Sequence, residues 1–166
     1  MQQFGRRFLI AVLALAALSG TAGAELAGSE APDFVLKAAS GKNHRLSEYR
    51  GQVVLVAFWA SWCGECRSQL EGLAGLHERY AGADLQMLAV SLDRERSQVI
   101  AAAQALGVGF PALHDAGGEV GEQYDVDNLP YVVLVDRDGL VRFEFTGYRR
   151  GEEDAYLERV RELLSE

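Results

Sequence analysis

The chain of 166 residues contains two cysteines, Cys63 and Cys66, in a C-x-x-C spacing. A disulfide across so short a loop restrains little of the unfolded chain, so a purely structural cross-link would add little stability. A structural zinc site would need further paired Cys or His ligands, and the sequence holds no second C-x-x-C and no H-x-H pair. The spacing therefore favours a redox pair that cycles between dithiol and disulfide.

The segments on either side of the cysteines predict where they lie. Residues 52–60 (QVVLVAFWA) form a continuous apolar run, β-branched early and aromatic late, which predicts a strand buried on both faces. Residues 66–80 repeat apolar side chains at helical spacing. Gly72 and Gly75 lower the helix propensity there, so tertiary packing must hold the helix. The cysteines therefore lie at a strand-to-helix junction.

This position predicts different chemistry for the two sulfur atoms. Free backbone N–H groups and the helix dipole stabilise a thiolate at a helix N-terminus, so we expect the pKa of Cys63 to fall below the ordinary value of about 8.5. Cys66, one turn into the helix, is expected to be shielded and to stay a thiol until it is needed. Cys63 would attack a partner's disulfide, and Cys66 would then displace the partner and form a Cys63–Cys66 disulfide.

Glu65, between the cysteines, is a candidate for redox tuning. Its negative charge would disfavour a nearby thiolate and so make the reduced form less stable and the protein more reducing. The alternative is that Glu65 is a solvated acid with little effect, since an acid is also favourable in the first turn of a helix.

The remaining segments predict an α/β fold. Patterning and turn residues predict two short strands around a turn at 40–43, a second buried strand at 85–93, a helix at 96–106, a loop with a short helix at 110–126, a hairpin at 131–147 and a final amphipathic helix at 152–166. A β-α-β unit makes neighbouring strands parallel, and the hairpin adds antiparallel ones. We therefore expect a mixed central sheet flanked by helices on both faces.

The N-terminus carries the pattern of a secretory signal peptide. Two arginines precede an apolar run at residues 8–18, and small residues follow, with Ala22 and Ala24 in an A-x-A arrangement. The run is short for a helix that crosses a membrane. We predict a signal peptide at residues 1–24, removed after Ala24; the alternative is an uncleaved anchor that holds the protein on the membrane, facing the periplasm.

Cleavage would leave a polar leader at residues 25–30 and one domain at residues 31–166. It would remove two arginines and no acid, so the formal charge of −8 would become −10, from 14 basic against 24 acidic side chains. An acidic domain without a Lys/Arg cluster argues against binding to nucleic acid, and membrane contact is expected only if the signal segment stays. Outside the cytosol a cysteine pair can oxidise and stay oxidised.

The strand, cysteine and helix motif resembles a known family. The segment VVLVAFWASWCGEC is similar to the active-site segment of the thioredoxin superfamily. The wider pattern resembles exported thioredoxin-like reductants of the TlpA/ResA/DsbE group, through the segments APDF, LSEYRGQVVLVAFWASWCGECR, LQMLAVSLD, GVGFPALHD and YDVDNLPYVVLVDRDGLV. The resemblance implies a thioredoxin-like fold with an N-terminal β extension and an inserted strand–helix segment at roughly residues 106–124. It also implies a periplasmic thiol-disulfide oxidoreductase that needs no cofactor.

The resemblance assigns further roles around the cysteines. Pro130, in NLPY, would be a cis-proline facing the cysteines, which would leave the backbone of Leu129 free to pair with an extended client segment. Trp62 and Gly64 would join Leu129 and Pro130 in binding the client, and Trp59 would be a core residue. The implied partners are disulfide-containing exported proteins, including apocytochrome c in cytochrome c biogenesis, and a membrane thiol donor of the DsbD/CcdA kind.

Two positions depart from the family pattern. Ala57 stands in the strand where thioredoxins carry an acid, and Gln69 stands where many ResA-like sequences carry Glu, three residues after the second cysteine. Neither side chain can take up a proton, so the sequence names no base for Cys66.

Two alternative functions remain at this point. A copper chaperone of the Sco type shares the fold and would use Cys63, Cys66 and His114, although such proteins space their cysteines as C-x-x-x-C. A thiol peroxidase also shares the fold, but Ala60 stands three residues before Cys63 where the peroxidase motif has threonine. The leading prediction has no metal ligand.

Overall fold

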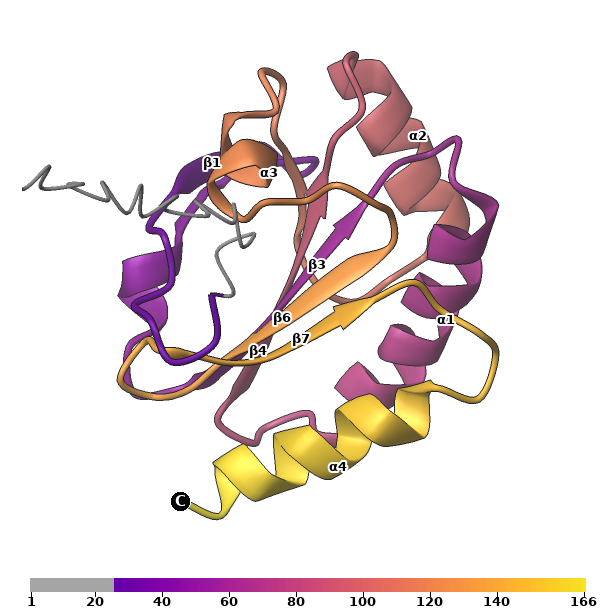
Figure 1. Cartoon of the computed structure of the whole chain (residues 1–166). Helices are drawn as coiled ribbons and strands as arrows, with labels where there is room; N and C mark the ends of the chain where they lie inside the picture. The colour runs from indigo at the N-terminus through magenta and orange to yellow at the C-terminus, as the bar shows by residue number, and fades with distance from the viewer. Residues whose placement is uncertain (1–25) are drawn as a thin grey trace, which may run out of the picture.

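Strand β3 (Val53–Trp59) is an interior strand of the sheet, and all seven of its residues are buried. It pairs in parallel with β4 (Leu85–Ser91) and antiparallel with β6 (Tyr131–Val135). All three strands are rich in β-branched and apolar residues, as strands covered on both faces require. The structure, a computed structural model, describes residues 26–166 (Figure 1).

Within residues 26–166 the sheet has seven strands in the order β2-β1-β5-β4-β3-β6-β7. At one end β1 (Val35–Ala38) and β2 (Asn43–Arg45) form an antiparallel pair, and β1 pairs with β5 (Ala112–His114). At the other end β7 (Val141–Thr146) pairs with β6 as the second arm of the predicted hairpin. The predicted mixed sheet and its N-terminal β extension are therefore confirmed.

Strand β5 lies in a segment where periodicity predicted only a loop and a short helix. Its three residues are too few to show an alternating pattern. The strand forms because β4 pairs with it in parallel on one side and β1 antiparallel on the other. With the short helix α3 (Glu119–Gln123), β5 makes up the inserted strand–helix segment that the family resemblance implied.

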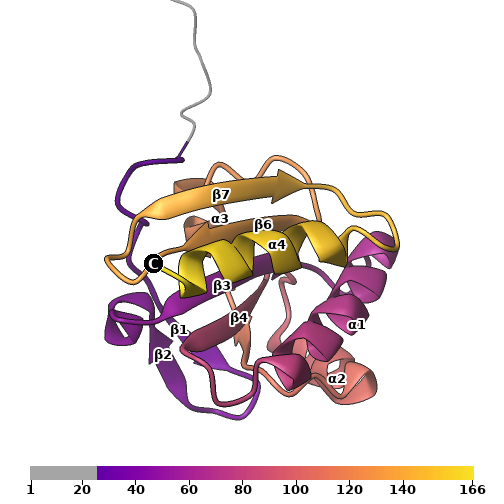
Figure 2. The same cartoon turned by 90° about the horizontal axis from the view of Figure 1, so that it is seen from below.

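Three helices pack together on one face of the sheet: α1 (Gly64–Arg79), α2 (Arg96–Leu106) and α4 (Glu153–Leu164). Figure 2 shows α4 and α1 lying across the sheet, with α2 beside α1. The helices bury one apolar core with the strands, to which they contribute Leu70, Leu73, Leu76, Val99, Tyr156, Leu157, Val160 and Leu163. This face holds the second cysteine, Cys66, which belongs to the same core.

A glycine lies where α1 meets the start of α4. A Cβ added at Gly72 would come 3.0 Å from the hydroxyl of Tyr148. That hydroxyl donates a hydrogen bond to Oε2 of Glu153, the first residue of α4, at 2.6 Å. The glycine therefore permits a close approach, in return for a helix propensity lower by about 1 kcal/mol than that of alanine.

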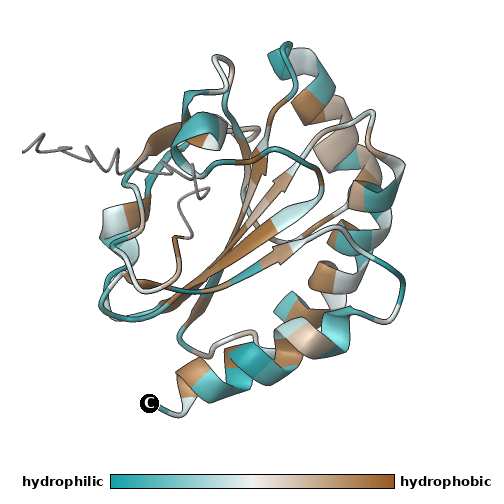
Figure 3. Cartoon of the chain, viewed as in Figure 1, coloured by the Kyte–Doolittle hydropathy of each residue, from teal (hydrophilic) through white to brown (hydrophobic). Residues whose placement is uncertain are grey.

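The opposite face is covered by shorter elements. The 3-10 helix η1 (Leu46–Tyr49) and α3 lie there, around a second core in which the Phe58 ring lies 5.2 Å from Tyr124 and 6.0 Å from Tyr131, between centroids. Helices on both faces were predicted and are found, but the long ones all share one face. In Figure 3 apolar colouring follows the strands, and polar colouring gathers on the outer helix surfaces and the turns.

The predicted signal peptide, residues 1–24, lies outside the described residues. Among residues 26–166 no helix combines the length and the apolar character needed to cross a bilayer.

Candidate redox site

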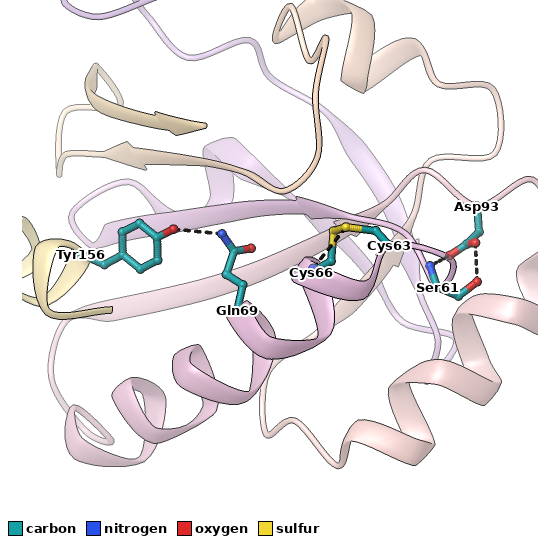
Figure 4. Close-up of a disulfide and its surroundings, with 6 residues drawn as sticks. All are labelled: Ser61, Cys63, Cys66, Gln69, Asp93 and Tyr156. Atoms are coloured by element: carbon teal, nitrogen blue, oxygen red, sulfur yellow. Dashed lines mark hydrogen bonds between the residues drawn. A yellow bond between two sulfur atoms is a disulfide. The ribbon is translucent and has the colours of Figure 1, made fainter. Parts of the chain in front are cut away.

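Cys63 lies directly before the first residue of α1, after a short turn that follows β3. It is the N-cap of α1, and the backbone N–H of Cys66 donates a hydrogen bond to its sulfur at 3.1 Å. Cys63 and Cys66 are joined as a disulfide (Figure 4). The predicted strand-to-helix junction is therefore present, with one N–H of the first helical turn already directed at the sulfur of Cys63.

The two sulfurs differ in exposure, as predicted. Cys63 is half-buried, whereas Cys66 is completely buried in the core beneath α1. Trp62, next to Cys63, is 73% exposed, which is unusual for so large an apolar side chain, and Trp59 is buried. A partner's disulfide can therefore reach Cys63 and the indole of Trp62 from solvent, but it cannot reach Cys66.

The loop before β6 approaches the same end of β3. The peptide bond between Leu129 and Pro130 is cis, as the resemblance implied. Phe58 is the register partner of Tyr131, so Pro130 lies next to the end of β3. Leu129 is half-buried and Pro130 buried, and Leu129 packs against the same core as Cys63. The structure thus brings the predicted client-binding residues to one end of the sheet.

Glu65 and Gly64 are both exposed in the first turn of α1. The acid therefore stands in solvent on the helix that begins at the disulfide. Its effect on the redox pair stays a prediction.

A buried carboxylate that sequence reasoning missed holds the turn before Cys63. Asp93 is 1% exposed and accepts hydrogen bonds from the backbone N–H of Ser61 at 2.9 Å and from its hydroxyl at 2.7 Å. The hydroxyl of Ser91 donates to the same carboxylate at 2.8 Å. An acid two residues after the end of β4 was the available signal, because the carboxyl ends of parallel strands such as β3 and β4 meet at one edge of a sheet.

The two departures from the family pattern are both buried. Ala57 lies inside β3 and is 1% exposed. Gln69 is fully buried, and its Nε2 donates to the Tyr156 hydroxyl at 3.0 Å, while its Oε1 has no hydrogen-bond partner. Where related proteins carry an acid, this chain therefore has a neutral amide, on α1 three residues after Cys66.

His114 does not join the cysteines. Its Nε2 donates to the backbone carbonyl of Asp93 at 2.9 Å. Among residues 26–166 no three side chains of the His, Cys, Asp and Glu types gather in a way that could hold a metal ion. Ala60, three residues before Cys63, is buried and offers no hydroxyl. Neither alternative function therefore gains support from this geometry.

Comparison with known proteins agrees with the site. The profile of the AhpC/TSA family matches residues 27–144. The chain belongs to the AhpC/TSA family. A relative called thiol-disulfide oxidoreductase ResA, from Geobacillus thermodenitrificans, is 34% identical over 154 residues, which cover 88% of each chain. The chain is thus a thioredoxin-like protein of the thiol-disulfide oxidoreductase type.

Two solved structures are similar over most of the chain. A protein described as a thiol:disulfide interchange protein DsbE, from Chlorobium tepidum, has a TM-score of 0.79 at 30% identity, and the match covers 83% of this chain and 97% of that one. The exposed lipoprotein thioredoxin of Streptococcus pneumoniae has a TM-score of 0.71 at 30% identity, with 80% and 100% covered. Both likenesses confirm the predicted thioredoxin-like fold.

Proposed function

We propose that this protein reduces disulfides in other exported proteins, with Cys63 as the attacking thiol. The observation that carries this proposal is the N-cap position of Cys63, whose sulfur receives the Cys66 N–H at 3.1 Å. In the reduced protein the same N–H and the helix dipole stabilise a thiolate, which is the nucleophilic form. The half-buried position leaves that sulfur within reach of a partner.

Cys66 completes the exchange. The Cys63 thiolate attacks one sulfur of the client disulfide, forming a mixed disulfide and releasing the other client sulfur as a thiolate. Cys66 then loses its proton and attacks the Cys63 sulfur, which frees the second client sulfur. Two electrons pass to the client, and the protein is left with the Cys63–Cys66 disulfide seen in the structure. Burial of Cys66 keeps it from reacting with the client directly.

The client binds, in this proposal, across the end of β3. Trp62 offers an exposed apolar surface, Gly64 leaves the approach to the disulfide open, and the loop at Leu129 and Pro130 presents backbone for pairing with an extended segment. The exposed charge of Glu65 disfavours the thiolate and so favours electron donation.

The direction of electron flow and the location form the finer part of the proposal. The signal-like N-terminus supports export to the periplasm, or anchoring there if the segment stays uncleaved. A membrane thiol donor of the DsbD/CcdA kind would restore the dithiol after each turnover. Apocytochrome c is the proposed client in cytochrome c maturation, which is supported by the likeness to proteins called ResA and DsbE.

Insulin reduction tests the chemistry, and a redox titration tests the direction. We expect the reduced protein to cleave insulin disulfides, and Cys66→Ser to trap a mixed disulfide through Cys63. Titration against glutathione should give a potential nearer to the value of about −270 mV of thioredoxin than to that of about −120 mV of DsbA. A DsbA-like value would reverse the proposed electron flow, and a folded protein unreactive with insulin would contradict the chemistry.

A further inference from the structure

Gln69 carries a buried oxygen with no hydrogen-bond partner in the described residues. The side chain is 0% exposed, and its Oε1 is orphaned. A buried polar atom left in this state destabilises the fold, so native proteins rarely keep one without a reason. Cys66 is also 0% exposed and lies three residues earlier on α1, on the same face of the helix.

The amide is held in a fixed orientation by the neighbouring helix. Its Nε2 donates to the hydroxyl of Tyr156, on α4, at 3.0 Å. Tyr156 is itself buried, and burial raises the pKa of its hydroxyl, which therefore stays neutral. Figure 4 shows the amide nitrogen turned towards Tyr156 and the amide oxygen on the side of the disulfide. The orphaned oxygen thus faces the redox pair.

We propose that Oε1 of Gln69 accepts a hydrogen bond from the thiol of Cys66 in the reduced protein, and that this bond sets the redox balance of the pair. Reduction adds two electrons and breaks the bond between the sulfurs. Cys66 takes up one proton and becomes S–H, while Cys63 is left as the thiolate that the helix N-terminus stabilises. The disulfide has no such hydrogen to donate. The oxygen is therefore satisfied in the reduced state and orphaned in the oxidised state described by the structure.

Two consequences follow for the chemistry. The hydrogen bond stabilises the dithiol relative to the disulfide, which opposes the effect proposed for Glu65 and limits how reducing the pair becomes. A thiol that donates a hydrogen bond also holds its proton more firmly, because the bond favours the neutral form. Cys66 is thereby kept as a thiol until Cys63 has captured a client. The inference concerns the pair itself and does not depend on the proposed direction of electron flow.

The substitution Gln69→Met tests the inference, since it keeps an unbranched side chain of similar length and removes the orphaned oxygen, which is the proposed acceptor. In equilibrium with glutathione we expect the variant to favour the disulfide about tenfold more than the native chain, which corresponds to a potential about 30 mV lower. The matched control is Gln86→Met. Gln86 is half-buried on β4, near the end of the strand away from the cysteines, and this change should leave the equilibrium as it is.

A merely structural role for Gln69 would give a different result. Loss of packing lowers the stability of both redox states equally and leaves the glutathione equilibrium unchanged. The proposed bond predicts that Gln69→Met lowers the unfolding free energy of the reduced protein more than that of the oxidised protein. Denaturant unfolding of both states, at one pH, measures this difference.

Infrared spectroscopy gives the deciding readout. In a Cys63→Ser background Cys66 is the only thiol, and we expect its S–H stretching band to move to higher frequency when Gln69→Met is added. Tyr156→Phe removes only the hydroxyl that orients the amide, and it should move the band in the same direction by a smaller amount. This variant replaces Gln69→Met in the test if Gln69→Met does not fold. An unshifted band in a folded variant overturns the inference, even if the glutathione equilibrium moves.

Discussion

The N-terminal β extension pairs its polar side chains with one another, whereas the redox end of the sheet leaves some of its groups without a partner. In the extension, Asp33 accepts hydrogen bonds from the backbone N–H and the hydroxyl of Ser47, both at 2.9 Å. The Nδ1 of His44 and the hydroxyl of Tyr49 form another hydrogen bond there. At the redox end the Oε1 of Gln69 is orphaned, and Trp62 stands 73% exposed in solvent. The first region is arranged for stability, whereas the second leaves groups available for a reaction.

The difference between the two regions predicts which substitutions should change stability and which should change thiol-disulfide exchange. A change in the extension removes contacts that exist in the folded protein at all times, so it should alter stability and not exchange. A change at the redox end removes groups whose partner arrives later, so it should alter exchange more than stability. Four predictions, from the largest expected effect to the smallest, test this contrast.

Cys63→Ser should abolish insulin reduction, because a serine hydroxyl does not form the nucleophile that exchange needs. Its unfolding free energy should stay within about 0.5 kcal/mol of the reduced native protein, since Cys63 is half-buried and the change is small. Turbidity of reduced insulin and urea unfolding measure the two quantities. Residual insulin reduction by the pure variant would show that another group can start the reaction.

Asp93→Ala should lower the stability and also slow thiol-disulfide exchange, so it marks the limit of the contrast between the two regions. It leaves the N–H of the half-buried Ser61 without its acceptor, at a cost of roughly 1 kcal/mol of unfolding free energy, and it frees the turn before Cys63. Exchange should slow as well, measured as the rate of Cys63 alkylation. Asp93→Asn, which keeps an acceptor oxygen, is the matched control; an equal loss in this variant would mean that the charge, and not the hydrogen bond, holds the turn.

Trp62→Ala should weaken the binding of protein clients and leave the stability of the fold nearly unchanged. Its ring is 73% exposed, so the unfolding free energy should change by less than about 0.5 kcal/mol. The KM for insulin should rise, while the rate with a small disulfide such as oxidised glutathione should stay the same. An equal loss with both substrates would place Trp62 in the positioning of Cys63 rather than in client binding.

Asp33→Asn should change the stability of the fold and its dependence on pH, and leave exchange unaltered. Burial works to raise the pKa of Asp33, but the hydrogen bonds from Ser47 and the neighbouring Arg45 outweigh it, and the pKa is lowered from 3.8. An acid with a lowered pKa stabilises the fold above its ordinary pKa and loses this contribution as the pH falls through the lower, folded value. The native chain should therefore exceed the variant in urea midpoint near neutral pH.

The difference in urea midpoint between the native chain and Asp33→Asn should become smaller as the pH falls below 3.8. Gln98→Ala, which changes an exposed side chain of α2 that does not titrate, is the control and should show no such trend. A constant difference between the native chain and Asp33→Asn at all pH values would contradict the assignment. Insulin reduction should be unaffected in both variants.

Sequence reasoning succeeded where the signal is local. The buried strand, the helix after the cysteines and the contrast between Trp59 and Trp62 depend on residues within a few positions of Cys63 and are confirmed. It missed Asp93 and the partner of Gln69, because the bonds join residues that are 32 and 87 positions apart in the chain. The three-residue strand β5 was missed for a related reason, since its neighbours on both sides, and not its own pattern, make it a strand.

The glycine at position 72 has a consequence for Gln69, which lies about one turn before it on α1. Because no methyl group projects there, the loop that carries Tyr148 can settle against α1, and α4 begins close by. Gln69, one turn earlier on α1, donates its 3.0 Å hydrogen bond to Tyr156 on the same helix α4. A methyl group at position 72 would press against the Tyr148 hydroxyl at the start of α4. We therefore expect this glycine, although it has no side chain, to help fix the orientation of the Gln69 amide.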